Sequence, residues 1–325
     1  MASNGVAEQL VKYLTDAHSI EVQALAQLKQ APAIAGDEQL AAAFREHLTE
    51  TEGHEQTIAG LLEQRGAKPS RAKDAVMWVG GKGFLLFAKL QPDTPGKLLA
   101  HALSYEALEL ASYELLHAVA DRAGDGEAAL AATRIRNDER VMIERLEELF
   151  DNGVEASLRE VKPRDLLEQL RKYLEDAHAI EEQAIALLER APKIVGEAAL
   201  AAVFEDHLVE TRDHAERIRE RLRALGADAS TWKDAALRLG ALEWGAFFRA
   251  HPDTPGKLAA FAYAFEHLEI GGYEQLRRVA ERAGDDETAA TAIGILGEER
   301  AAAERIAEQF ADAAAASLTA VGAAG

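Results

Sequence analysis

The chain repeats itself at a constant offset of 160 residues, and this duplication constrains its fold more than any other feature. The stretch His47-Leu-Thr-Glu-Thr-Glu-Gly-His54 returns as His207-Leu-Val-Glu-Thr-Arg-Asp-His214, and the hexapeptide PDTPGK that begins at Pro92 returns letter for letter. A constant offset means that no net insertion separates the two copies. Each copy is too long to be one repeat of a solenoid, so we predict two globular domains, residues 1–160 and 161–325.

The composition of the 325 residues excludes several classes of function. There are 36 Lys and Arg against 56 Asp and Glu, a net charge of −20, with no basic stripe that would suit nucleic acid or an anionic membrane. The absence of cysteine excludes disulfides, thiolate catalysis and iron–sulfur clusters. The first residues do not resemble a signal peptide and no apolar run has membrane-spanning length, so we expect a cytoplasmic protein with no membrane partner.

The spacing of apolar residues predicts four long helices in each half. In the first half they cover about residues 6–30, 37–65, 94–124 and 127–161, and no stretch alternates as a strand would. A long connection, residues 67–91, joins the second helix to the third, while short turns make the other joints. One long crossover in the middle is typical of the ferritin type of four-helix bundle. We therefore expect an all-α fold of two tandem four-helix bundles, each with a crossover between helices two and three.

Every predicted helix places at least one glutamate on its otherwise apolar face. Several carboxylates cannot be buried together near pH 7 unless their pKa values shift or a cation lies among them. These faces carry almost no lysine or arginine, and carboxylate and imidazole ligands suit iron or manganese, with zinc a competitor. The candidate metal ligands are Glu21, Glu50, His54, Glu106, Glu109 and Glu139, with their copies Glu181, Glu210, His214, Glu266, Glu269 and Glu299.

Three local features carry a resemblance to a known family: HL-ET-H from His47, YE-x-x-E-x-x-x-Y from Tyr105, and the triplet Asp-Glu-Arg from Asp138. With the four-helix pattern they resemble the ferritin-like superfamily and, within it, the YciE/YciF family of stress-associated proteins, present here in tandem. The resemblance implies a dinuclear metal site in each half, most readily of iron, with manganese or zinc as alternatives. It also implies roles: Glu21 and Glu106 as terminal or bridging ligands, Glu50 and Glu139 as bridging ligands, His54 on one metal ion and Glu109 as an extra carboxylate.

The sequence departs from the ferritin-like pattern in two places. The usual motif is Glu-x-x-His, whereas Glu50 and His54 are four residues apart, a spacing that still shares a helix face. The fourth helix should also bring a histidine three residues after its glutamate, but Met142 stands there, and Ala302 in the second half. Whether His18 or His47 compensates is left open by the sequence. We expect Asp138, like its copy Glu298, on a solvated helix face. We expect Tyr113 and Tyr273 to pack in the core, or to donate a hydrogen bond or an electron to the site.

The resemblance implies redox chemistry on dioxygen or hydrogen peroxide, of the ferroxidase or peroxidase type. Without cysteines the chain has no electron donor of the rubredoxin kind, so turnover needs an external reductant or the oxidation of ferrous iron itself. The alternative is a stress protein that binds metal, or acts structurally, without turnover; storage in a hollow shell is less favoured. The two halves are expected to pack as a pseudo-dimer within a monomer or a small homo-oligomer.

Overall fold

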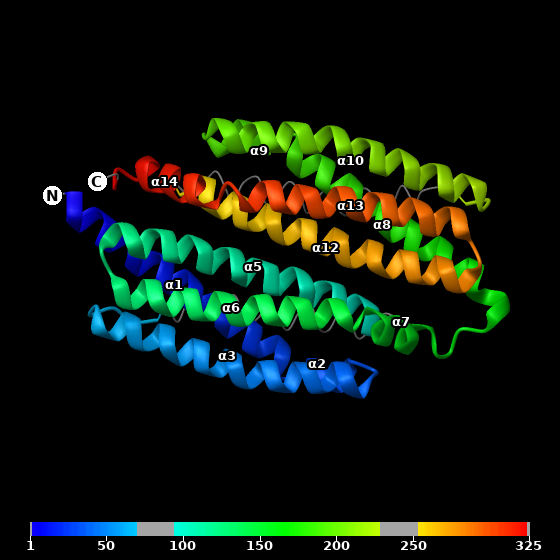
Figure 1. The fold of residues 1–325 in the computed structure, drawn as a ribbon, viewed down its shortest axis with the longest axis horizontal. Coiled ribbons are helices and arrows are strands. Elements are labelled where there is room, and N and C mark those ends of the chain that lie inside the picture. The colour runs from blue at the N-terminus through cyan, green and yellow to red at the C-terminus, as the bar shows by residue number, and fades with distance from the viewer. Residues whose placement is uncertain (1, 70–93, 228–252, 324–325) are drawn as a thin grey trace. The chain divides into compact units, whose positions relative to one another are not determined.

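The computed structural model describes residues 2–69, 94–227 and 253–323, and these residues form helices joined by turns (Figure 1). No strand occurs among them, which confirms the all-α prediction. None of the described helices is both long and apolar enough to cross a membrane. The chain divides into two compact units, Met1–Ser157 with Phe310–Gly325, and Leu158–Gln309. The division near residue 158 is close to the predicted limit at 160, but residues 310–325, which the repeat assigns to the second domain, group with the first unit.

The first unit is a closed bundle of four long helices. Helix α1 packs against α3 and α5, and α6 packs against α5 and α3, so that each helix has two neighbours. Their apolar faces meet in a core in which Leu14, Phe44 and Leu103 are almost completely buried. The bounds of the long helices are α1 (Ala2–Leu28), α3 (Glu38–Gln64), α5 (Thr94–Ala123) and α6 (Gly126–Glu148), and the shorter ones are α2 (Ala31–Ile34), α7 (Phe150–Leu158) and α14 (Phe310–Ala320).

Side chains at the helix starts explain where the chain turns. Asp37 caps α3 by accepting hydrogen bonds from the backbone N–H groups of Gln39 and Leu40, which have no partner within the helix. Asp125 does the same for α6 at Ala128. The predicted fourth helix, residues 127–161, is broken at Leu149, between α6 and α7.

Two contacts show that α3 and α5 run in the same direction. Near the start of both helices, Gly36 lies so close to Pro95 that a β-carbon on the glycine would be 2.7 Å from Pro95 Cγ. Near their other ends, Arg65 Nε donates to Asp125 at 2.9 Å. The connection between α3 and α5 therefore joins opposite ends of the bundle. The predicted crossover, residues 67–91, lies outside the described residues apart from its first three, and the same holds for most of its copy in the second half.

The second unit repeats this arrangement. Helix α8 packs against α10 and α12, and α13 packs against α12 and α10. Arg221 Nη2 lies 3.0 Å from Asp285 Oδ1, which is the counterpart of the Arg65–Asp125 pair. The bounds are α8 (Leu166–Leu188), α9 (Ala191–Val195), α10 (Ala198–Ala224), α12 (Thr254–Ala283) and α13 (Asp286–Ala307), preceded by the 3-10 turn η1 (Pro163–Asp165).

Candidate metal centre

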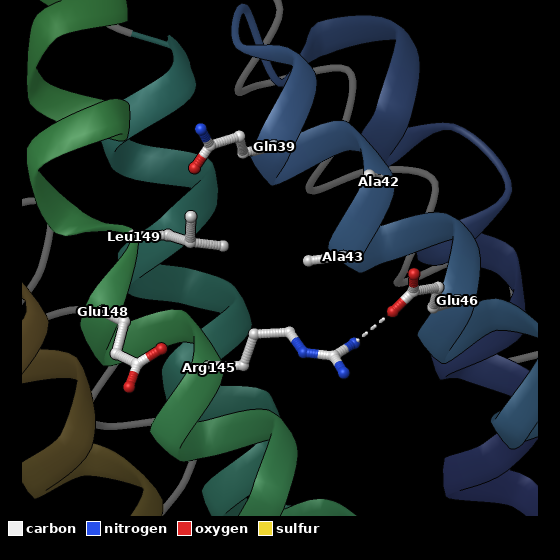
Figure 2. Close-up of a pocket in the computed structure, with 7 residues that line it drawn as sticks. All are labelled: Gln39, Ala42, Ala43, Glu46, Arg145, Glu148 and Leu149. Atoms are coloured by element: carbon white, nitrogen blue, oxygen red, sulfur yellow. Dashed lines mark hydrogen bonds and ion pairs between the residues drawn. The ribbon is translucent and has the colours of Figure 1, made fainter.

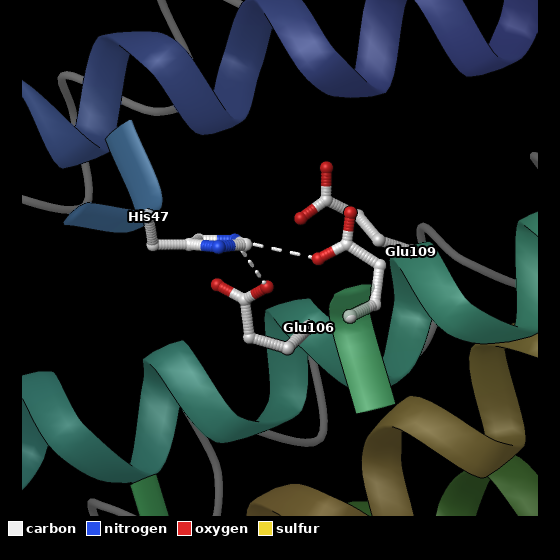
Figure 3. A group of neighbouring side chains, drawn as sticks. His47, Glu106 and Glu109 are labelled. Carbon is white, nitrogen blue, oxygen red and sulfur yellow. Dashed lines mark ion pairs between the residues drawn. The ribbon is translucent and has the colours of Figure 1, made fainter. Parts of the chain in front are cut away.

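Six ionisable side chains meet inside the first bundle. All four long helices contribute, and each of the six side chains belongs to a residue that is at most 6% exposed. Figure 3 shows three of them, His47, Glu106 and Glu109, directed toward one another. The six are Glu21 from α1, His47 and His54 from α3, Glu106 and Glu109 from α5, and Glu139 from α6.

The six residues form two overlapping groups that share Glu139. His47, Glu106, Glu109 and Glu139 each offer an atom within 4.8 Å of the others, and Glu21, His54 and Glu139 do the same. His47 Nε2 lies 3.3 Å from one oxygen of Glu139, and His54 Nδ1 lies 3.0 Å from the other oxygen. A carboxylate with an imidazole nitrogen at each of its oxygens would be able to bind a cation on either side.

The atoms that face into the two groups lie close together, with His47 Nε2 at 2.9 Å from Glu106, but none has a partner with hydrogen-bond geometry. Within the described residues, this is true of His47 Nε2, His54 Nδ1, one oxygen each of Glu21 and Glu106, and both oxygens of Glu109 and Glu139. A buried polar atom without a partner costs free energy, and a buried charge without one costs more. An oxygen- and nitrogen-binding cation would satisfy all of these atoms at once, so the residues fit a pair of metal ions.

Three carboxylates of the site have raised pKa values, as expected for carboxylates that are buried close together. Burial, then repulsion from Glu139, raises the pKa of Glu21 to about 8. Burial also raises the pKa of Glu106 to about 7, although the His47 imidazole opposes it. Burial and the same repulsion raise the pKa of Glu109 well above its usual range. Glu21 therefore holds a proton near pH 7 unless a cation replaces it, and burial favours the protonated form of Glu106 and Glu109 as well.

Glu139 experiences opposing effects. Burial disfavours its charge, but the imidazoles of His47 and His54, close to its two oxygens, outweigh burial and lower the pKa of Glu139 to about 2. In the second half, burial prevails and raises the pKa of the copy, Glu299, to about 7. The ionised form is the better description of both, because each carboxylate lies within 3.5 Å of two imidazole nitrogens.

The second bundle contains the same constellation. His207 Nε2 lies 2.9 Å from Glu266 and 3.5 Å from Glu299, while His214 Nδ1 lies 2.8 Å from Glu299. The same set of atoms lacks hydrogen-bond partners as in the first half. The second constellation comprises Glu181, His207, His214, Glu266, Glu269 and Glu299.

Both halves match one protein family. The domain of unknown function DUF892 matches residues 6–159 and again residues 165–319. The chain belongs to the DUF892 family. No solved structure matches it. The two matched segments follow the two copies of the sequence repeat, so this DUF892 protein carries two domains of its family in tandem.

Outside the six residues, a carboxylate hydrogen-bonds the remaining nitrogen of each histidine. Glu50 lies 2.9 Å from His47 Nδ1, and Asp138 lies 3.2 Å from His54 Nε2. Such carboxylates orient a metal-binding imidazole and make it a stronger ligand. The structure thus places Glu50, which the sequence offered as a ligand, beside the centre, with 46% of its side chain exposed. Asp138 is 54% exposed, as expected for a solvated face, and still reaches the histidine.

Two further predictions concern residues around the centre. The Tyr113 hydroxyl donates a hydrogen bond to Glu21, and Tyr273 does the same to Glu181, so each tyrosine packs in the core and also holds a carboxylate of the site. His18, which the sequence left open as a substitute ligand, instead lies 2.9 Å from Glu55 through its Nε2. The second histidine that the structure brings into the buried cluster is therefore His47. The sequence signal that could have identified His47 was its position on the apolar face of α3 and its repetition as His207.

A surface pocket of about 310 Å³ opens between α3 and α6 (Figure 2). It is lined by Gln39, Ala42, Ala43, Glu46, Arg145, Glu148 and Leu149. Arg145 donates to Glu46 across it at 2.8 Å. Ala43 precedes His47 by one helical turn, so the pocket lies next to the layer of the bundle that holds the centre.

Proposed function

We propose that each half of this DUF892 protein binds a dinuclear metal centre, most readily of iron, with manganese or zinc as alternatives, inside a bundle of the ferritin-like type. The observation that carries the proposal is the set of buried, unpartnered ligand atoms repeated atom for atom in both halves. The parallel direction of α3 and α5 supports the ferritin-like topology.

The ligand inventory supports a dinuclear centre of the carboxylate type. Ferritin-like dinuclear centres are built from a glutamate on each of two helices and a Glu-x-x-His motif on each of the other two, which makes four glutamates and two histidines. Here the same inventory is distributed differently, because α3 supplies both histidines and α5 two of the glutamates. His47 takes the place of the histidine that the fourth helix lacks.

We assign His47, Glu106 and Glu109 to one cation position, Glu21 and His54 to the other, and Glu139 to both. Glu50 and Asp138 orient the two imidazoles, and Tyr113 holds Glu21 in place. The surrounding apolar core excludes bulk water from the six inward side chains. A pair of iron or manganese ions would supply electrons for the reduction of dioxygen or hydrogen peroxide.

The proposal is tested by metal analysis followed by an oxidation assay. Protein purified from cells supplied with iron and manganese is expected to carry about four metal ions per chain. Ferrous iron added to the metal-free protein in air should then be oxidised faster than by a variant with Glu21→Ala and Glu181→Ala. Four ions without faster oxidation would favour the alternative, a stress protein that binds metal without turnover. A stably folded chain that binds no metal would exclude both metal-based functions.

His47 and Glu50 are expected to respond very differently to substitution. His47→Ala with His207→Ala removes an inward ligand from each half, and should weaken binding at one cation position in each half by more than about 100-fold. Glu50→Ala with Glu210→Ala removes only the hydrogen-bond partner of that histidine, and should weaken binding about 10- to 100-fold. Titration of the metal-free variants with cobalt(II) measures both. A larger loss in the Glu50 variant would instead make Glu50 a direct ligand, as the sequence suggested.

A further inference from the structure

The two candidate centres have the same inner residues but differ in what contacts the outer carboxylates. In the first half, Glu50 and Asp138 each hydrogen-bond a histidine. No arginine forms an ion pair with either carboxylate among the residues that the structure describes. In the second half, an arginine pairs with each of the corresponding carboxylates.

The first of these arginines is Arg217, which lies over Glu298. Its Nη1 donates to the two carboxylate oxygens at 2.9 and 3.3 Å, and its Nη2 donates to the carbonyl of Thr291 at 3.5 Å. A β-carbon on Gly294 would lie 2.7 Å from Nη2, so the guanidinium occupies space that only a glycine leaves open. In the first half, Thr57 stands at the position of Arg217, and Arg134 stands at the position of Gly294.

The second arginine is Arg305, whose guanidinium donates to Glu210. Its copy in the first half, Arg145, is directed to Glu46 at 2.8 Å instead. Each half therefore has an arginine at this position, but only in the second half does it pair with the carboxylate that supports a histidine.

These pairs change the charge around the second centre. In the second half both outer carboxylates pair directly with an arginine, and Arg217 also lies 3.5 Å from Asp213. In the first half Arg145 attracts Glu50 only from beyond ion-pair distance. A neutralised carboxylate supports its imidazole less, and a nearby guanidinium repels a cation directly. One contact acts in the other direction, since His214 lies 2.6 Å from Glu298 but His54 lies 3.2 Å from Asp138. A shorter hydrogen bond at one ligand does not offset the direct pairing of both outer carboxylates with arginine.

We propose that Arg217 and Arg305 make the second half the weaker of the two metal sites, so that the first half fills first. This inference rests on the proposed dinuclear centres. It assigns the arginines a tuning role for the metal affinity of one half, without contact to the metal or to a substrate.

The test is a titration of the metal-free chain with cobalt(II), followed by its visible absorption. Two variants isolate the halves: Glu299→Ala leaves the first centre intact, and Glu139→Ala leaves the second. We expect the dissociation constant of the second centre to be about tenfold higher, within the range of effects for partners of metal-binding histidines. The full chain should then titrate in two steps.

Removal of the arginines should make the metal affinities of the two centres similar. In the Glu139→Ala background, Arg217→Met with Arg305→Met should lower the dissociation constant to near that of the first centre. Gly294→Ala should do so in part, because its β-carbon displaces the guanidinium while alanine favours the helix. The matched control is Arg212→Met, which removes an arginine of the same helix that pairs with Glu189 at 2.9 Å, and it should change nothing.

Each outcome decides the inference. Equal affinities in the two half-site variants, or weaker binding after the arginines are removed, would overturn the tuning role and leave the proposed centres standing. Failure of both half-site variants and of the full chain to bind cobalt(II) would overturn the proposed function, and the tuning role with it. A tighter second centre in the double methionine variant, with no change in the Arg212→Met control, would support the role.

Discussion

Alanine in place of Glu139 is expected to cost the first half both of its metal ions while the second half keeps its own. Glu139 belongs to both groups of candidate ligands, and it lies between the two inward imidazole nitrogens. Without it, one cation position retains only Glu21 and His54, and the other loses a charged ligand as well. Metal content should therefore fall from about four to about two ions per chain.

The matched control for this substitution is Glu144→Ala. Glu144 is an exposed glutamate on the same helix, so its replacement by alanine makes the same chemical change without affecting the core. It should leave the metal content unchanged. Glu139→Gln preserves the shape of the side chain and distinguishes loss of a ligand from loss of packing, because both variants should bind equally little metal. If the alanine variant kept one ion in the first half, Glu139 would serve a single position and would not be a bridge.

The location of the buried cluster was predictable from the sequence because helical periodicity is a strong signal in long helices. Glu21, His54, Glu106, Glu109 and Glu139 were placed on apolar faces by spacings of three and four residues, and the structure buries all five. Burial of so many carboxylates is what required a cation or large pKa shifts, and the raised pKa values follow from it.

A shared helix face was not enough to decide whether Glu50 or His47 points into the centre. The angle of each residue around the helix axis was also needed. Residues in an α-helix advance by about 100°, so His54, seven residues after His47, returns to within about 20° of it. Glu50 then points about 60° to one side of His47 and reaches only the flank of the centre. The heptad spacing of the two histidines was present in the sequence. Without the packing of α3 against its neighbours, however, the direction of the centre within that face was not known.

The outer partners could not be predicted from periodicity at all. Asp138 precedes Glu139 and therefore points about 100° away from it, toward solvent. Its contact with His54 comes from a helix 84 residues away in sequence, and depends on how closely α3 and α6 pack. The arginine pairs of the second half depend likewise on rotamers and on the space at Gly294, neither of which a spacing pattern contains.

The metal-free protein is expected to lose stability as the pH rises from 6 to 8. Folding raises the pKa of Glu21 and of Glu181 from 4.5 to about 8, so above pH 4.5 the unfolded chain releases protons that the folded chain retains. Burial lowers the pKa of His54 and His214, but their carboxylate partners outweigh it and raise both from 6.5 to about 9. Their stabilisation is complete below pH 6.5 and disappears toward pH 9. Each excess proton costs about 1.4 kcal/mol of unfolding free energy per pH unit, so the total loss should be several kcal/mol.

Urea unfolding at pH 6, 7 and 8, in the presence of a chelator and then with metal restored, measures this effect. Metal ions replace the retained protons, so the metal-loaded protein should show a flat or rising stability over the same range, and metal should stabilise most at pH 8. The control is a chain with Glu21→Gln and Glu181→Gln, whose neutral amides remove two of the titrating groups and should make the metal-free slope shallower. Metal-free stability that is constant or increases from pH 6 to 8 would mean that the inward carboxylates are ionised without a cation, and the main physical reason for a metal centre would be lost.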